Sequence, residues 1–233
     1  MGYNRKIILC GVCGSHAYGL ANEDSDIDKL GIYVSPTKDI LSLHKPKETI
    51  CKTNPDITYH EVEKFIRLAC KCNPTILELL YLKKYDIVSP EGQLLIDIKS
   101  SFLTNTIFNS YGGYAISQAR KLNIRAYTDN ELNAPLSKVT RGFSAKTSNR
   151  PFKHARHCLR LLQQGRQLLE TGNLNVEVQN KDELMSLNNL TVQQLINKFE
   201  KEYKEFKNTN SMLPDKIEYN IINKTLLKIR GMN

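Results

Sequence analysis

Short apolar runs bounded by turn residues dominate the first ninety positions and predict β-strands. Residues 6–10 (KIILC) are apolar and end at glycines, while residues 26–34 (DIDKLGIYV) first alternate and then become apolar and β-branched. Residues 56–62 (DITYHEV) alternate as well, and residues 85–89 (YDIVS) are a further candidate. We therefore expect a small mixed β-sheet in this part of the chain.

Helical spacing of apolar residues begins at Val62 and takes over beyond residue 91. Asn73 followed by Pro74 is a typical start for a second helix, because asparagine caps helices and proline suits the first helical position. Five later segments are predicted to be helices, at residues 91–103, 109–122, 152–172, 191–206 and 216–230. The predicted fold class is α+β, with a sheet domain over residues 1–95 and a helical domain over residues 96–233.

Two aspartates one residue apart stand at the start of the second predicted strand. Strand side chains alternate between faces, so Asp26 and Asp28 point the same way. Neighbouring carboxylates repel each other unless a cation lies between them. Mg²⁺, or Mn²⁺ in its place, suits such a pair because it binds one or two carboxylates together with substrate phosphates.

A Gly-Ser turn precedes these acids and offers the complementary half of a nucleotide site. Gly14 lets the backbone approach an anion closely, and the Ser15 hydroxyl with the following N–H groups can hold triphosphate oxygens. His16 is a further candidate phosphate contact, or it only closes the turn. The rival interpretation is a solvated surface turn, and a calcium loop is excluded because Lys29 and Ser35 replace its glycine and glutamate.

The positive charge is concentrated in one part of the chain. The net charge is +9, yet residues 1–100 contain 13 basic and 13 acidic side chains, whereas residues 101–170 contain 11 basic and 3 acidic ones. A localised basic segment is typical of a protein that binds a polyanion such as RNA. A solvated basic face without a partner is the alternative.

One predicted helix, over residues 152–172, carries several of these basic side chains. Lys153, His157 and Arg160 share one face by helical spacing, so they could contact either a triphosphate or a nucleic-acid acceptor. An ordinary surface helix explains the same spacing. Glu78 is a separate anomaly, since it lies within an apolar helical run (NPTILELL) and its role stays open.

The stretch GSHAYGLANEDSDID resembles the signature of the DNA polymerase β nucleotidyltransferase superfamily. Further segments narrow the resemblance to a bacterial and phage family of nucleotidyltransferases, some of which are described as belonging to RNA repair. These segments are GSHAYGL…SDIDKLGIYV, EKFIRLACKCNPTILELLYL, GGYAISQARKL, KHARHCLRLLQQGRQLLETG and MLPDKIEYNII. The similarity extends over essentially the whole chain.

The resemblance implies metal-dependent transfer of a nucleotidyl group from a nucleoside triphosphate to a hydroxyl. It assigns the triphosphate to Gly14 and Ser15, and the metal to Asp26 and Asp28. A third carboxylate on a neighbouring strand completes such sites and helps to deprotonate the attacking hydroxyl. Asp56 is the chosen candidate, with Glu61 as the alternative.

These observations predict an enzyme that acts on an RNA acceptor, either tRNA or a broken RNA end. A protein or small-molecule acceptor, as in nucleotide-modifying toxins, is the alternative enzyme, and a catalytically silent RNA-binding protein is the alternative from another class. No apolar run approaches the roughly 20 residues of a membrane span, and the N-terminus has no signal-peptide pattern. We therefore expect a cytoplasmic protein without a membrane partner.

Overall fold

The computed structural model describes residues 5–23, 25–121 and 150–232. It confirms an α+β fold, with a mixed sheet in the N-terminal part and helices after it. The chain forms two compact units; the first is Met1–Thr104 with Leu174–Glu177 and Pro214–Asn233, and the second is Asn105–Asn173 with Val178–Leu213. The single boundary expected after residue 95 differs from this path, because the last helix returns to the first unit.

The first unit is built on a five-stranded sheet within the described residues. The strand order is β3-β4-β2-β1-β5, in which only the central pair β2–β4 is parallel. The strands are β1 (Lys6–Cys13), β2 (Asp28–Val34), β3 (Thr49–Thr53), β4 (Asp56–Glu61) and β5 (Ile87–Val88). β1 and β2 pair antiparallel, so the predicted strand 26–34 lies directly beside the predicted strand 6–10.

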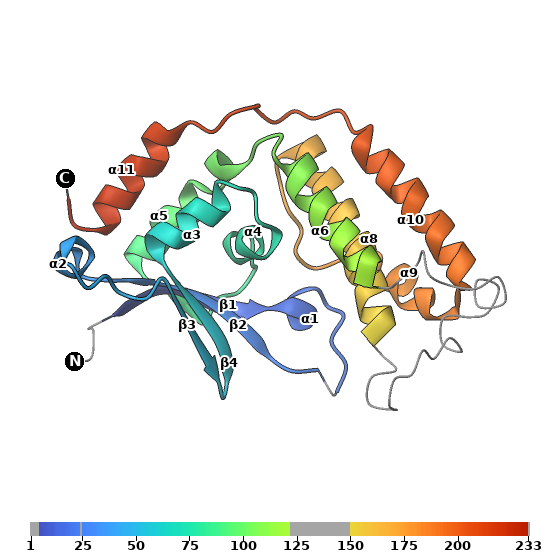
Figure 1. Cartoon of the computed structure of the whole chain (residues 1–233), viewed down its shortest axis with the longest axis horizontal. Helices are drawn as coiled ribbons and strands as arrows, with labels where there is room; N and C mark the ends of the chain where they lie inside the picture. Colours follow the sequence, from blue (N-terminus) through green and yellow to red (C-terminus); the bar gives the residue numbers. More distant parts are fainter. Residues whose placement is uncertain (1–4, 24, 122–149, 233) are drawn as a thin grey trace. The chain divides into compact units, whose positions relative to one another are not determined.

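Helices of the first unit cover one face of this sheet (Figure 1). α3 (Val62–Ala69), α4 (Pro74–Leu80) and α5 (Pro90–Asp97) lie on this face, and α11 (Tyr219–Ile229) packs on α3 and α5. The unit also contains α1 (Gly14–Ala17) and α2 (Thr37–Leu41) at the ends of the sheet, and the 3₁₀ turn η1 (Lys99–Phe102). The predicted capping of α4 is confirmed, because Asn73 accepts a hydrogen bond from the Ile76 N–H at 3.3 Å and Pro74 takes the first helical position. The covered face carries Leu30 and Ile32 into the core.

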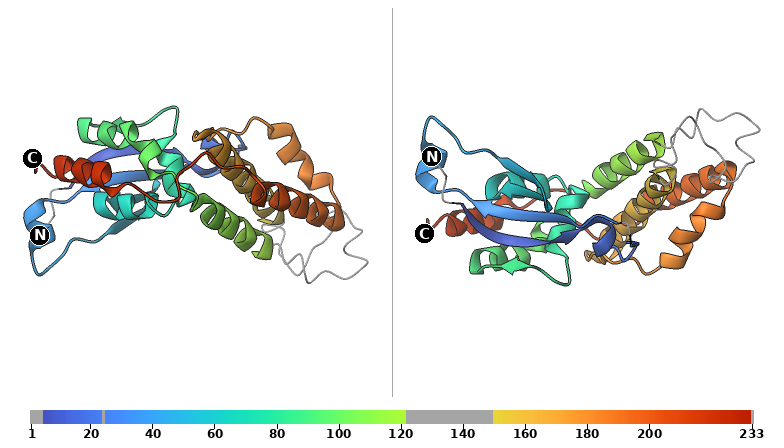
Figure 2. Two further views of the ribbon diagram at one scale, coloured as in Figure 1. Left: turned by 90° about the horizontal axis from the view of Figure 1, so that it is seen from above. Right: turned by 90° about the horizontal axis from the view of Figure 1, so that it is seen from below.

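The opposite face of the sheet holds a smaller apolar cluster of Cys10, Tyr33, Ile57 and Tyr59. In the described part of the chain no helix lies over it, as the view from below in Figure 2 shows. The two tyrosine rings are nevertheless buried, and basic side chains lie over them: Arg5 over Tyr33 and Lys52 over Tyr59. Cationic side chains with long apolar stems can cover aromatic surface in this way.

A buried ion pair attaches the last helix to the sheet. Glu61, at the end of β4, accepts hydrogen bonds at 3.1 Å from both terminal nitrogens of Arg230, and both side chains are only 7 % exposed. Glu61 also caps α3 by accepting the Glu63 N–H at 2.8 Å. This one carboxylate therefore joins the sheet, α3 and the end of α11.

The second unit consists of helices that pack through a glycine contact. Its elements are α6 (Ile107–Lys121), α8 (Arg150–Thr171), α9 (Lys181–Ser186), the 3₁₀ turn η5 (Leu187–Asn189) and α10 (Val192–Lys207). A Cβ atom on Gly165 of α8 would lie 2.7 Å from the Phe206 ring and 3.0 Å from the Tyr111 Cβ. Only glycine at this position lets the three helices approach so closely.

Several elements were not predicted, and some predictions lie outside the described residues. The elements without a prediction are α1, α2, β3, α9 and η5. Residues 122–149 of the basic segment 101–170, most of which lie between two of the predicted helices, fall outside the part that the structure describes. No helix among the described residues is both long enough and apolar enough to cross a membrane.

The buried ion pair yields a stability prediction. Glu61→Gln removes the buried carboxylate that binds Arg230 through two hydrogen bonds and leaves only Glu63, 3.7 Å from Arg230, so we expect the free energy of unfolding to fall by about 3 kcal/mol in urea titrations. Glu48→Gln is the matched control, because Glu48 pairs with Arg67 on the exposed surface, where such a change costs below about 1 kcal/mol. Equal losses in the two variants would contradict a special role for Glu61.

His157 of α8 yields a pH prediction for the second unit. Burial, with the nearby charge of Arg160, lowers the pKa of His157 to about 3, whereas an unfolded histidine titrates near ~6.5. As pH falls from about 6.5 the unfolded state gains a proton that the folded state does not bind, so stability decreases by up to about 1.4 kcal/mol per pH unit. Urea titrations at neutral and mildly acidic pH should show a weaker dependence in His157→Asn and an unchanged one in the exposed control His44→Asn.

Candidate active site

The Gly-Ser turn and Asp28 meet at the end of the β1–β2 pair. Cys13 ends β1 and pairs with Asp28, the first residue of β2, so the fourteen-residue segment between them closes on itself. Gly14 adopts a φ of +68°, and a Cβ atom on it would lie 3.0 Å from Asp28 Oδ2. Glycine is therefore required both by the left-handed backbone and by the carboxylate against it.

The short helix α1 begins without a side-chain cap. Cys13 occupies the N-cap position and makes no side-chain hydrogen bond to the helix. The turn is held at its other end, where the Tyr18 N–H donates to the Gly14 carbonyl at 3.1 Å and the Leu20 N–H to the Ser15 carbonyl at 2.9 Å. The backbone N–H groups of the first turn therefore donate no hydrogen bond to the side chain of the N-cap residue. Such N–H groups at a helix start suit an anion.

His16 holds the loop that leads to the aspartates. Its Nε2 donates to the Ser25 carbonyl at 3.1 Å, and Ser25 is bonded to Asn22 through both its backbone and its hydroxyl. These contacts fix the approach to Asp26, which is exposed directly after Ser25. The structure thus places His16 in a loop-closing role, and a phosphate contact by His16 stays a prediction.

The strand register brings Asp56 rather than Glu61 beside Asp28. Lys29 pairs with Ile57 and Leu30 with Thr58 in the parallel ladder. Asp28 and Asp56 each lie one residue before the first of these pairs, and their positions belong to the face that carries Leu30 and Thr58. Glu61 stands at the other end of β4, in the ion pair with Arg230.

The donor set fits a hard divalent cation that shares its ligands with a substrate. Within residues 5–23, 25–121 and 150–232, no three His, Cys, Asp or Glu side chains are gathered as a metal site. Two neighbouring carboxylates without a complete protein cage are nevertheless typical of Mg²⁺, which takes its other ligands from phosphates and water. The residues present therefore fit a magnesium ion bound together with a triphosphate.

Glu78 and Tyr18 support the turn. The sequence pattern singles out Glu78 but not Tyr18. Glu78 of α4 is 2 % exposed and accepts a hydrogen bond at 2.6 Å from the hydroxyl of Tyr18, the C-cap of α1. Burial, together with the charges of Glu78 and Asp28, raises the pKa of Cys13 to about 12. The sequence signal for Glu78 is an acidic residue within an apolar helix, because a carboxylate is buried only when it has a partner.

The three candidates on α8 lie in the second unit and differ in exposure. Lys153 is exposed, whereas Arg160 is 1 % exposed and donates to His157 Nδ1 at 2.9 Å and to Gln164 Oε1. His157 and Arg160 thus share a hydrogen-bonded network inside α8 rather than an open basic stripe. Contact of Lys153, His157 or Arg160 with a triphosphate or with RNA stays a prediction.

The contact between Gly14 and Asp28 can be tested by adding one methyl group. Gly14→Ala should lower the free energy of unfolding by about 1–2 kcal/mol through its left-handed backbone and should also displace the Asp28 carboxylate. Gly231→Ala is the matched control, because Gly231 has a φ of +70° with open space around it. Loss of nucleotide-dependent Mg²⁺ binding, measured by calorimetry, is expected in the first variant and not in the second; equal binding in both would contradict the assignment.

Comparison with known proteins bears directly on this geometry. The model of the RlaP family, described as the RNA repair pathway DNA polymerase beta family, matches residues 2–226. A protein of Enterobacteria phage T4, named "Uncharacterized 38.9 kDa protein in nrdC-mobD intergenic region", is 30 % identical over 134 residues. That alignment covers 52 % of this chain and 40 % of the phage protein, so the chain spans less than half the length of this relative. The family match confirms the resemblance read from the sequence, and the chain belongs to the RlaP family of the DNA polymerase β superfamily.

Proposed function

We propose that this protein transfers a nucleoside monophosphate from a nucleoside triphosphate to a hydroxyl group of RNA, with Mg²⁺ or Mn²⁺. Membership of a polymerase β-type family linked to RNA repair supports the reaction class. The single observation that carries the proposal is the contact of Gly14 with Asp28. A backbone turn suited to phosphate and a carboxylate suited to a cation lie against each other there.

In this proposal the turn binds the triphosphate. The amides of the first turn of α1 and the Ser15 hydroxyl donate to phosphate oxygens, because both are donors at a helix start without a side-chain cap. Glu78 positions this turn through the Tyr18 hydroxyl. His16 orients the loop before Asp26 by its bond to the Ser25 carbonyl.

The carboxylates of Asp26, Asp28 and Asp56 would hold the divalent cation. When bound, the cation neutralises phosphate charge and lowers the pKa of the acceptor hydroxyl. Asp56 accepts the proton of that hydroxyl. The acceptor oxygen forms a bond to the α-phosphorus, the bond from the α-phosphorus to the β-bridging oxygen breaks, and pyrophosphate leaves with the electron pair.

RNA is the proposed acceptor because two independent features favour a polyanion. The family is described by an RNA repair pathway, and residues 101–170 contain 11 basic against 3 acidic side chains. A tRNA or a broken RNA end would both offer a terminal hydroxyl. Cytoplasmic location remains an expectation that accompanies this acceptor.

Transfer of label tests the proposal. The protein is incubated with α-labelled nucleoside triphosphates, Mg²⁺ or Mn²⁺ and total RNA, and labelled RNA is expected. Asp28→Asn should reduce the rate by about 10²–10³, the range typical of losing one electrostatic group of an active site. Asp97→Asn is the matched control, because Asp97 is an exposed aspartate of the same unit that accepts a hydrogen bond from the Gln93 side chain at 2.8 Å.

Three outcomes contradict the proposal in different ways. Label on protein instead of RNA would identify a toxin-like nucleotidyltransferase. Absence of label with every acceptor and both metals would favour a catalytically silent RNA-binding protein. An equal rate in Asp28→Asn and Asp97→Asn would remove Asp28 from the reaction.

A further inference from the structure

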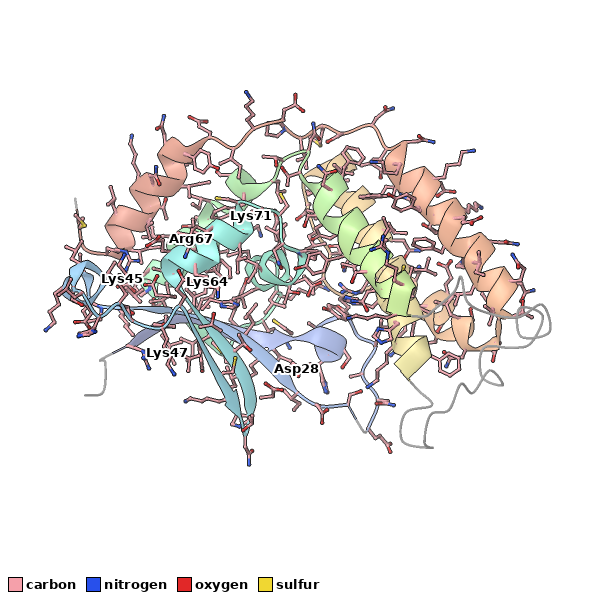
Figure 3. All side chains as sticks on the ribbon, viewed as in Figure 1. Asp28, Lys45, Lys47, Lys64, Arg67 and Lys71 are labelled. Carbon is pink, nitrogen blue, oxygen red and sulfur yellow. The ribbon has the colours of Figure 1, made fainter. Side chains whose placement is uncertain are left out.

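A group of basic side chains gathers on the first unit, away from Asp28, and belongs to no part of the site described above. Lys64, Arg67 and Lys71 follow one side of α3 and its end, and Lys45 and Lys47 come from the segment before β3 (Figure 3). We call these five residues the α3 basic surface. The spacing of three and four positions between the first three keeps them on neighbouring turns.

Acidic side chains compensate this surface only in part. Glu48 pairs with Arg67 and lies 4.0 Å from Lys64, and Glu63 lies 3.8 Å from Arg67. In the described part of the chain, no ion pair involves the side chains of Lys45, Lys47 or Lys71. Five basic side chains face two acidic ones, so a net positive charge remains available for an anionic partner.

A groove of about 440 Å³ runs beside the α3 basic surface, between α3 and α11. Lys64, Arg67 and Lys71 line it together with the acidic Glu48 and Glu63, and Leu226 contributes apolar surface from α11. Tyr219 lies at the same groove and is 59 % exposed. Positive charges beside an exposed aromatic ring are the combination that binds a single strand, since phosphates meet the charges and a base stacks on the ring.

We propose that the α3 basic surface and this groove bind a single-stranded segment of the RNA acceptor. This inference rests on the proposed function for its choice of RNA. An acidic peptide would satisfy the charges, but its aspartate and glutamate side chains offer no flat ring to cover Tyr219 and the apolar groove. Phosphates repeated along one strand suit the row of basic residues better.

The position of the surface defines which part of the acceptor it holds. α3 begins directly after Glu61 at the end of β4, whereas Asp56 begins that strand. A six-residue strand spans about 20 Å, and Figure 3 shows Asp28 well separated from Lys64 and Arg67 in the same unit. The surface therefore holds nucleotides at a distance from the reacting end, and an acceptor of only two nucleotides cannot reach it.

Binding of a labelled single-stranded oligoribonucleotide, followed by fluorescence anisotropy at several salt concentrations, tests the inference without nucleotide or metal. Substitution of Lys45, Lys47 and Lys71 together by Gln should weaken binding at least tenfold near 0.1 M salt and reduce the salt slope by about 2, because each phosphate contact contributes about 0.7. The same three positions changed to Arg keep the charge and should retain affinity and slope. Tyr219→Ala should weaken binding, and Tyr219→Phe should not.

The failure of this inference and that of the proposed function can be told apart. Equal RNA binding by the Gln and Arg triple variants overturns the inference even if label transfer succeeds. Complete displacement of the oligoribonucleotide by an acidic peptide also overturns it. Selective loss of binding in the Gln variant supports the inference even if no transfer is detected. Where transfer occurs, the Gln variant should raise KM for a long acceptor and leave a dinucleotide acceptor unaffected, and an equal effect on both would overturn the placement.

Discussion

The close approach of Gly14 to the Asp28 carboxylate is the constraint on which the candidate site depends. It arises from strand register, because the pairing of Cys13 with Asp28 closes the intervening segment, and from a left-handed backbone that only glycine adopts without strain. The neighbouring contacts follow from it: His16 fixes the loop through Ser25, and Tyr18 anchors the turn on buried Glu78. The turn proposed to bind phosphate and the acid proposed to bind the cation therefore come from one continuous stretch of chain.

The remainder of the first unit holds this stretch in place from far along the sequence. Arg230 returns to Glu61 at the opposite end of β4, so a residue close to the C-terminus stabilises the strand that begins with Asp56. The return of α11 also creates the groove beside α3. The candidate site therefore lies at the start of β4, whereas the groove lies beside α3, which follows the end of the same strand.

Strong local patterns were sufficient for most of the elements. The apolar runs at β1 and β2, the alternation in β4 and the Asn73-Pro74 start of α4 were all readable, because each segment buries a regular face or carries its own cap. The pattern of apolar residues did not predict β3, whose residues are half-buried or exposed at the edge of the sheet. It also did not predict the four-residue helix α1. Short elements of this kind form through their neighbours, and their own sequence carries little periodicity.

The sequence by itself singled out the candidate residues of the turn, since Gly14, Ser15, Asp26 and Asp28 lie within one short segment, although β2 begins only at Asp28. Only the tertiary structure shows that Asp56 stands beside Asp28 and that Glu61 meets Arg230, because the pairing of distant strands sets both neighbours. It also placed Arg160 in the interior and assembled the α3 basic surface within a segment of zero net charge. Charge summed along a chain is independent of folding, whereas folding separates like and unlike charges in space.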